Sequence, residues 1–151
     1  PPTIGFLDAE QADVLTEIRP GVYPFNDAQQ VEIGSCCFDD IALTAVATVV
    51  RRDAHRIVLD AGSKILGADR ASWATGYGRL LDHHDARIVL LSEHHAVVDF
   101  PASSAEGIPR YRQFRAGGPE HVCNAVNLVD ELVAIDGSDT RWPVIARGRN
   151  S

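Results

Sequence analysis

Several residue types are scarce in this 151-residue sequence, and each scarcity excludes a class of protein. The three cysteines are an odd number, and Cys36 and Cys37 are adjacent, so a disulfide framework is not expected. We expect this adjacent pair to be small, buried apolar side chains. No apolar run approaches the roughly 20 residues that cross a bilayer, and the start of the chain lacks the layout of a signal peptide. The sequence therefore predicts a cytoplasmic protein with no membrane partner.

Basic residues are also outnumbered, since 14 Lys and Arg face 21 Asp and Glu and leave a net charge of −7. An acidic domain repels phosphate backbones, so we expect no nucleic-acid partner. Methionine is absent, and the chain opens on the loop-like residues Pro1, Pro2 and Thr3. We expect this start to be a cut inside a longer protein. The length fits one domain with a sizeable core.

Short β-rich segments separated by Gly, Pro and Asp are the strongest pattern that is present. Long amphipathic helices are missing, although Asp27 is placed to cap a short helix that runs to about Glu32 and stops at Gly34. The predicted strands cover residues 41–50, 56–59, 87–91, 96–100, 111–115, 132–135 and 142–146. Short strands with tight turns predict a mainly β fold, a closed or nearly closed β-barrel with one or more short helices.

The sharpest candidate for chemistry is the pair His121 and Cys123. On a strand, residues i and i+2 face the same side, so the imidazole and the thiolate can reach one point in space. Both are good zinc ligands, and two protein ligands leave positions open for water or substrate, as a catalytic metal requires. The H-x-C spacing alone is equally typical of ordinary strand side chains, so this alternative stays open.

Two further histidine-containing clusters are present. Glu93, His94 and His95 lie between two apolar runs, so we expect them at a strand end or a tight hairpin, where they could reach a metal, a substrate or a partner subunit. Solvated turn residues are the alternative interpretation. His83 and His84 lie in a polar connector, and we interpret them as surface residues.

Only one lysine could hold a carbonyl cofactor as a Schiff base. Lys64 follows a turn after a predicted strand, and we expect it to be a surface or salt-bridging residue instead. The sequence has no P-loop and no G-x-S-x-G, C-x-x-C or H-E-x-x-H motif. The corresponding nucleotide-binding, hydrolase, redox and metalloprotease functions are not predicted.

Six motifs follow one another in a specific order. They are EIRPGVYPFND at 17–27, ALTAVATVV at 42–50, LDAGSK at 59–64, LSEHH at 91–95, PEHVCNAVNL at 119–128 and WPVIARG at 142–148. One motif could arise by chance, but six in order are specific. The series resembles the C-terminal part of the D-serine dehydratase and D-threonine aldolase family, over nearly the whole chain.

This resemblance implies an alanine-racemase-like fold, with a C-terminal-type β-barrel domain in this chain. In the family, an N-terminal (β/α)8 barrel holds pyridoxal 5'-phosphate on a lysine, and the C-terminal β-domain completes the active site, typically within a dimer. We therefore expect residues 1–16 to be the tail of that barrel and residues 17–151 to be the C-terminal β-domain with the metal site. The implied partners are the N-terminal barrel of the same protein, a second copy in a homodimer, and a small D-amino acid.

The resemblance also implies roles for individual residues. The family's divalent metal, usually zinc, falls on His121 and Cys123. Thr3, which resembles the end of the family's phosphate loop, and Tyr23 are candidates for contact with the cofactor. Glu93 is a candidate catalytic residue.

His95 is a further catalytic candidate, although the cluster around it departs from the family pattern. The chain has His94 and Ala96 on either side of His95, where the family commonly reads Glu-Glu-His-Gly. It also has Asn124 after the metal cysteine, where the family commonly has Pro. The role of His94 is therefore open.

The implied activity is a metal- and pyridoxal-phosphate-dependent lyase that acts on 3-hydroxy-D-amino acids. Dehydration of D-serine to pyruvate and ammonia is our first expectation, because some aldolase members carry Asp at the position of Cys123. The alternatives are D-threonine aldolase-type Cα–Cβ cleavage and a non-catalytic β-barrel module that binds a metal. We expect the chain alone to be inactive, because the cofactor lysine would lie in the N-terminal barrel.

Overall fold

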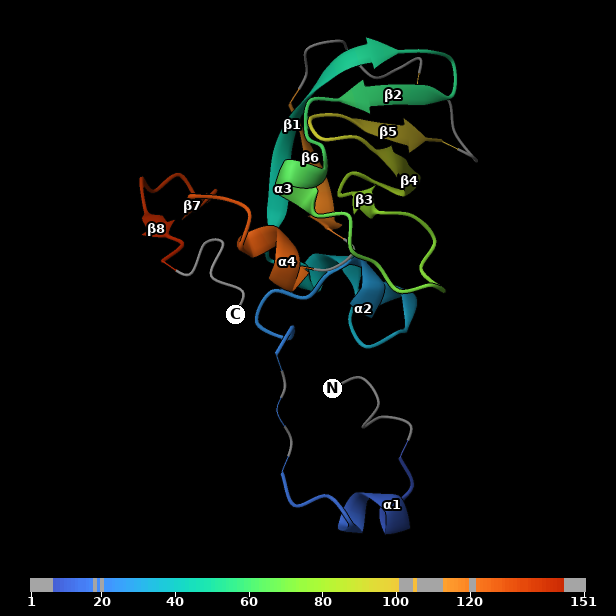
Figure 1. Ribbon diagram of the computed structural model, residues 1–151, viewed down its shortest axis with the longest axis vertical. Helices are drawn as coiled ribbons and strands as arrows, with labels where there is room; N and C mark the ends of the chain where they lie inside the picture. Colours follow the sequence, from blue (N-terminus) through green and yellow to red (C-terminus); the bar gives the residue numbers. More distant parts are fainter. Residues whose placement is uncertain are drawn as a thin grey trace.

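The described part of the chain forms a six-stranded antiparallel barrel (Figure 1). The computed structural model describes residues 7–17, 19, 21–100, 105, 113–119 and 122–145. Around the barrel the strands run β1-β2-β5-β4-β3-β6, and β6 pairs with β1 to close the ring. The strands are β1 Thr44–Arg52, β2 Arg56–Leu59, β3 Gly78–Leu80, β4 His83–Leu91, β5 Ala96–Asp99 and β6 Gln113–Pro119. The predicted β-barrel is confirmed.

The described helices are short, and three of them precede β1 in the chain. They are α1 Ala9–Asp13, α2 Ala28–Glu32, α3 Ser63–Leu66, α4 Val122–Val126 and a 3-10 turn, η2, at Phe38–Asp40. The predicted helix is confirmed as α2, because the Asp27 carboxylate accepts the amide of Gln30 at 2.9 Å and Gly34 follows the helix with φ of 74°. None of the helices in the described ranges has the length and hydropathy needed to cross a bilayer.

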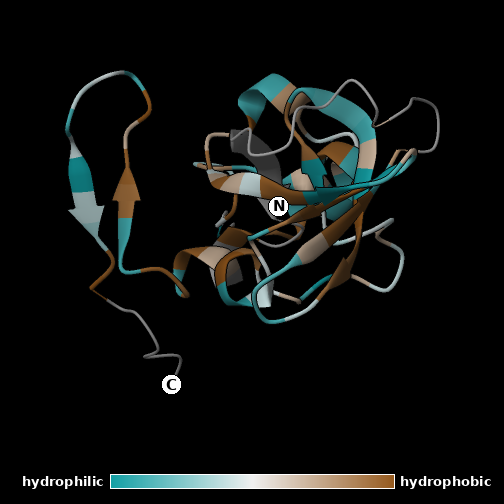
Figure 2. Cartoon of the chain, turned by 90° about the horizontal axis from the view of Figure 1, so that it is seen from above, coloured by the Kyte–Doolittle hydropathy of each residue, from teal (hydrophilic) through white to brown (hydrophobic). Residues whose placement is uncertain are grey.

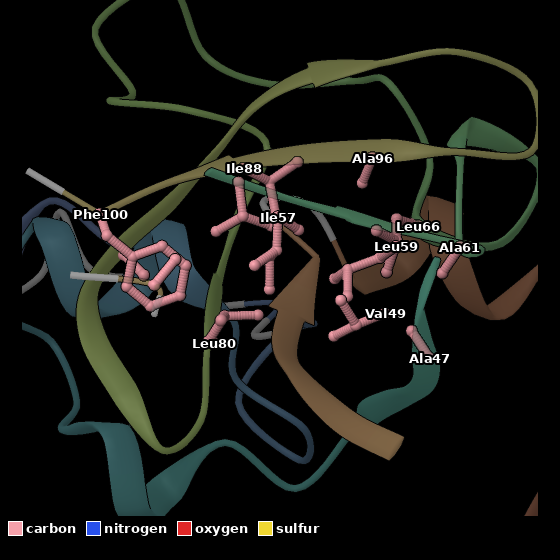
Figure 3. Close-up of a cluster of buried hydrophobic side chains, with 13 residues drawn as sticks. Ala47, Val49, Ile57, Leu59, Ala61, Leu66, Leu80, Ile88, Ala96 and Phe100 are labelled. Atoms are coloured by element: carbon pink, nitrogen blue, oxygen red, sulfur yellow. The ribbon is translucent and has the colours of Figure 1, made fainter. Parts of the chain in front are cut away.

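The core lies inside the barrel (Figure 3). Buried residues alternate with less buried ones in β1, β2, β4 and β5, as the two-residue period of a strand requires. In β2 this alternation buries Ile57 and Leu59 completely, and α3 adds Leu66 to the same cluster. Full burial of each such side chain is worth about 1.5–3 kcal/mol.

The histidines 83 and 84 are strand residues, so their expected place in a connector is wrong. The turn after β3 is tight, because Leu80 already pairs with His83, and β4 therefore begins earlier than the apolar run suggested. The His84 ring stacks on Phe38 with centroids 3.8 Å apart, and His83 meets the edge of Phe100 at 5.6 Å. His84 is exposed, as expected, but His83 is half-buried.

The last two strands form a separate antiparallel hairpin, β7 Glu131–Val133 and β8 Arg141–Pro143, which stands beside the barrel (Figure 2). An apolar groove of about 310 Å³ lies between this hairpin and β1. Leu43 and Val46 line one side of the groove, and Leu132 and Val133 line the other.

Candidate functional site

The backbone of Cys123 lies in the first turn of α4, so the strand predicted for this segment is wrong. His121 lies outside the described residues. Strand β6 ends at Pro119, which has no N–H to continue a sheet ladder, and helical geometry begins at Val122. Cys123 is therefore a helix residue, and the two-residue period of a strand does not apply to it.

Helix α4 is held at its start by a carboxylate from α2. The Asp27 side chain is completely buried, and its Oδ2 accepts the amide of Val122 at 3.2 Å. The first N–H groups of a helix have no partner within the helix, so this contact satisfies one of them. Val122 is itself completely buried, and Ala125 is 5% exposed. The segment that carries Cys123 is thus anchored from the interior.

The residues Glu93, His94 and His95 form the exposed turn between β4 and β5. Lys64 Nζ lies 3.1 Å from the Glu93 carboxylate, and His94 Nε2 lies 3.8 Å from the same group. The Lys64 hydrogen bond, followed by the positive charges of Lys64 and His94, lowers the pKa of the Glu93 carboxyl. Glu93 is therefore ionised at neutral pH, and the salt-bridging interpretation of Lys64 is confirmed.

Helix α3 is pressed against this turn. The amides of Ser63 and Lys64 donate to the carbonyls of Ser92 and Glu93 at 2.8 and 3.2 Å. A Cβ at Gly62 would lie 2.3 Å from the Ser92 carbonyl oxygen, so only glycine allows this approach. Helix α3 also contacts α4. The 92–95 turn, α3 and the Cys123 segment therefore form one continuous packing unit.

Of the two residues expected to contact a cofactor, the structure describes only Tyr23. Tyr23 is 67% exposed and lies in a turn where the amides of Phe25 and Asn26 both donate to the Val22 carbonyl. Thr3 lies outside the described residues. Lys64 offers no cofactor site either, because its side chain is 57% exposed and engaged with Glu93.

A metal site would depend on the H-x-C pair. Within the described ranges, no group of three or more His, Cys, Asp or Glu side chains could hold a metal ion. An imidazole and a thiolate are a donor set that zinc prefers, and the two together leave coordination positions open. His121 and Cys123 thus fit a divalent metal by their chemistry.

The sequence indicates only one of the two contacts that Asp27 makes in this region. Asp27 was recognised as the cap of α2, and the motif around it gave that signal. Its second contact joins residues 95 positions apart, so no local pattern could have indicated it. The expected burial of the adjacent cysteines is also wrong, because Cys36 is half-buried and Cys37 is exposed with its thiol 3.0 Å from Asp40.

Related proteins of known sequence fall into two groups. An uncharacterized protein of Mycobacterium tuberculosis is 51% identical over 131 residues, which cover 82% of this chain and 97% of that protein. The D-threo-3-hydroxyaspartate dehydratase of Delftia sp. is 37% identical over 82 residues, or 50% of this chain and 22% of the enzyme. The D-serine dehydratase of Dictyostelium discoideum is 39% identical over 57 residues, or 36% of this chain and 14% of the enzyme.

Solved structures share the fold. An alanine-racemase-like protein from Idiomarina loihiensis superposes with a TM-score of 0.73 at 26% identity, over 89% of this chain and 39% of that one. The Delftia dehydratase superposes with a TM-score of 0.72 at 27% identity, over 89% of this chain and 40% of the enzyme. The expected alanine-racemase-like fold is confirmed, and this chain spans about two fifths of these longer chains.

Two further solved structures are variants of a D-threo-3-hydroxyaspartate dehydratase. One replaces a cysteine by alanine and is described as the metal-free form, and the other replaces a histidine two positions earlier. The sequence profile of the family described as a putative serine dehydratase domain matches residues 42–135, which is most of the chain. Because this profile matches most of the chain and dehydratases are similar to it in sequence, the chain belongs to the family described as a putative serine dehydratase domain.

Proposed function

We propose that residues 17–151 are the C-terminal β-domain of a metal- and pyridoxal-phosphate-dependent lyase that acts on 3-hydroxy-D-amino acids. The proposed reaction is the dehydration of D-serine to pyruvate and ammonia. The observation that carries this proposal is the sequence pair His121 and Cys123, of which Cys123 lies in the first turn of α4. Its spacing equals that of the histidine and cysteine replaced in the variant structures of a D-threo-3-hydroxyaspartate dehydratase.

In this proposal His121 and Cys123 would hold a divalent metal, with zinc as the first choice. Such a metal, when bound, supplies Lewis-acid assistance to the departure of the β-hydroxyl group. The chain's own contribution is to fix the position of this ligand pair. Val122 lies between the two proposed ligands in the sequence. It is completely buried, and its amide donates a hydrogen bond to the Asp27 carboxylate.

The turn that carries Glu93 and His95 is proposed to line the same active site. Helix α3 joins this turn to α4, and the Lys64 contact keeps Glu93 ionised. A carboxylate in this state accepts hydrogen bonds, so Glu93 would orient a substrate ammonium group rather than donate a proton. Tyr23 and Thr3 are proposed to face the cofactor.

The cofactor would be bound by a lysine of an N-terminal barrel of the same protein, with residues 1–16 as the tail of that barrel. Pyridoxal 5'-phosphate supplies an electron sink for the bond that breaks at Cα. Lys64 is unsuited to hold it, because its amine is exposed and paired with Glu93. A cytoplasmic homodimer is the proposed assembly, as the family resemblance implies.

Two other functions remain candidates. D-threonine aldolase-type cleavage would use the same metal position, but Cys123 favours the dehydratase. A metal-binding module without catalysis is favoured by one observation, because the Mycobacterium tuberculosis relative is covered over 97% of its length by this domain. A full-length protein that binds zinc at His121 and Cys123 without turning over D-serine or D-threonine would support the module.

The test compares metal content and dehydratase activity in parallel. In the full-length protein, His121→Ala and Cys123→Ala should remove bound metal and lower the turnover of D-serine on the order of 100-fold or more. His55→Ala and Cys37→Ala are matched controls, because both side chains are exposed and lie outside α4. Full metal occupancy and retained activity in the double variant of residues 121 and 123 would contradict the proposal.

A further inference from the structure

The Asp27 carboxylate joins two helices that are far apart in the sequence. Its Oδ1 accepts the amide of Gln30 at 2.9 Å in α2, and its Oδ2 accepts the amide of Val122 at 3.2 Å in α4. The side chain is completely buried. A buried carboxylate is costly unless hydrogen bonds compensate it, and amides at helix starts are strong donors to it. The two hydrogen bonds thus compensate the cost of burying the Asp27 carboxylate.

Helix α2 is a fixed platform for that carboxylate. At its other end, Glu32 pairs with Arg79, which is 3% exposed, and accepts the amide of Thr75 at 3.1 Å. Gln29 accepts the amide of Ala71 at 3.3 Å. Asp27 therefore belongs to the start of a helix that is held by contacts other than those with α4. Its carboxylate can for this reason fix the position of α4.

The amide that Asp27 accepts has a particular place in the chain. Val122 lies between His121 and Cys123, so a shift of its backbone moves both proposed ligands together. We propose that Asp27 is a positioning residue for the metal site. By accepting the Val122 amide, Asp27 fixes the position of the H-x-C segment. This inference rests on the proposed function, because it assigns a role toward the metal that His121 and Cys123 would hold.

The test uses a substitution that separates the two contacts. Asp27→Ser keeps an oxygen able to cap α2, since serine is as good an N-cap as aspartate, but has no second oxygen for Val122. In the full-length protein, the Val122 amide should exchange with solvent at least about tenfold faster. Zn²⁺ affinity, measured by competition with a chelating dye, should fall about 10- to 100-fold, the range found when a partner that orients metal ligands is lost.

Two controls distinguish positioning from a general loss of stability. Asp99→Asn weakens the ion pair with Arg56 between β2 and β5, and Asp8→Ser alters the cap of the exposed helix α1, where Asp8 accepts the amide of Gln11 at 2.7 Å. Both should leave Zn²⁺ affinity within about twofold of the wild type. Asp27→Asn, which keeps the size of the side chain and replaces one acceptor oxygen by a donor, is the second variant if serine does not fold.

The outcomes separate this inference from the proposed function. Zn²⁺ binding that is lost in Cys123→Ala but unchanged in both Asp27 variants would overturn the positioning role and leave the proposed function standing. Unchanged exchange of the Val122 amide would overturn it as well. A wild-type protein that binds no Zn²⁺ would overturn the proposed metal site and this inference with it. An equal loss of affinity in Asp99→Asn would show that stability, not Asp27, controls the site.

Discussion

At the scale of single residues, the Lys64–Glu93 pair makes a prediction about titration. Lys64→Gln removes the hydrogen bond and charge that lower the pKa of Glu93, so this pKa should rise toward its usual value near 4.5. Lys64→Arg should keep it low. The measurement is a carbon-13 titration of the Glu93 carboxyl by NMR, and identical curves for the wild type and Lys64→Gln would refute the assignment.

The sign of the pH effect on stability follows from the same pair. The pKa of Glu93 is lower in the folded protein than in the unfolded chain, so the contribution is fully present above the unfolded pKa. It is lost as the pH falls from about 4.5 through the lower folded value. Both side chains are exposed, so the effect on the free energy of unfolding is small.

The sequence predicted some of these residues well. The position of Lys64 after a turn predicts a surface or salt-bridging residue, and aspartate before a short polar segment predicts a helix cap at Asp27. The contact of the second Asp27 oxygen with the Val122 amide could not be predicted from the sequence. Asp27 and Val122 are distant in the chain, and only the folded structure brings them together. The exposure of Cys37 was missed because its partner Asp40 belongs to a short 3-10 turn with no clear sequence signal.

At the scale of elements, the contact of α3 with the β4–β5 turn makes a second prediction. Gly62→Ala should lower the free energy of unfolding by about 1–3 kcal/mol, because its Cβ would meet the backbone of Ser92 and Glu93 and force the turn away. Denaturation in urea measures this loss. Gly21→Ala is the control, because a Cβ there meets nothing within 4 Å. Equal losses in the two variants would argue against a tight approach at Gly62.

Elements with local signals were predictable and elements set by distant contacts were not. The bounds predicted for β2 are confirmed, since 56–59 is a short apolar run closed by a clear turn. Helix α4 differs from the strand that the H-x-C spacing suggests, because its five residues carry no clear period and the amide of Val122 is bound by Asp27, 95 positions away. Strand β3 has only three residues, including one glycine and one arginine, so its existence depends on its pairing with β4 and β6.

At the scale of the whole molecule, the sequence predicts the class of fold but not the order of the strands in the barrel. Short β segments and tight turns are enough to predict a barrel. The order β1-β2-β5-β4-β3-β6 depends on pairings between segments that are not consecutive, such as β2 with β5 and β3 with β6. No local pattern encodes these choices, because the same inward and outward alternation would suit several orders.

The closure of the ring by β1 and β6 has a consequence for how the chain reaches its native state. Thr44 pairs with Gly117, so this seam encloses nearly all of the barrel sequence, whereas β4 and β5 are joined by one short turn. Closing a long loop costs more entropy, so we expect β4–β5 amides to be protected before β1–β6 amides when refolding is followed by pulsed hydrogen exchange. Simultaneous protection would refute this order.

Until the seam closes, β1 and β6 each present an unpaired edge that another molecule can extend. The yield of refolding should therefore fall as protein concentration rises, even though the finished ring pairs both strands on both sides.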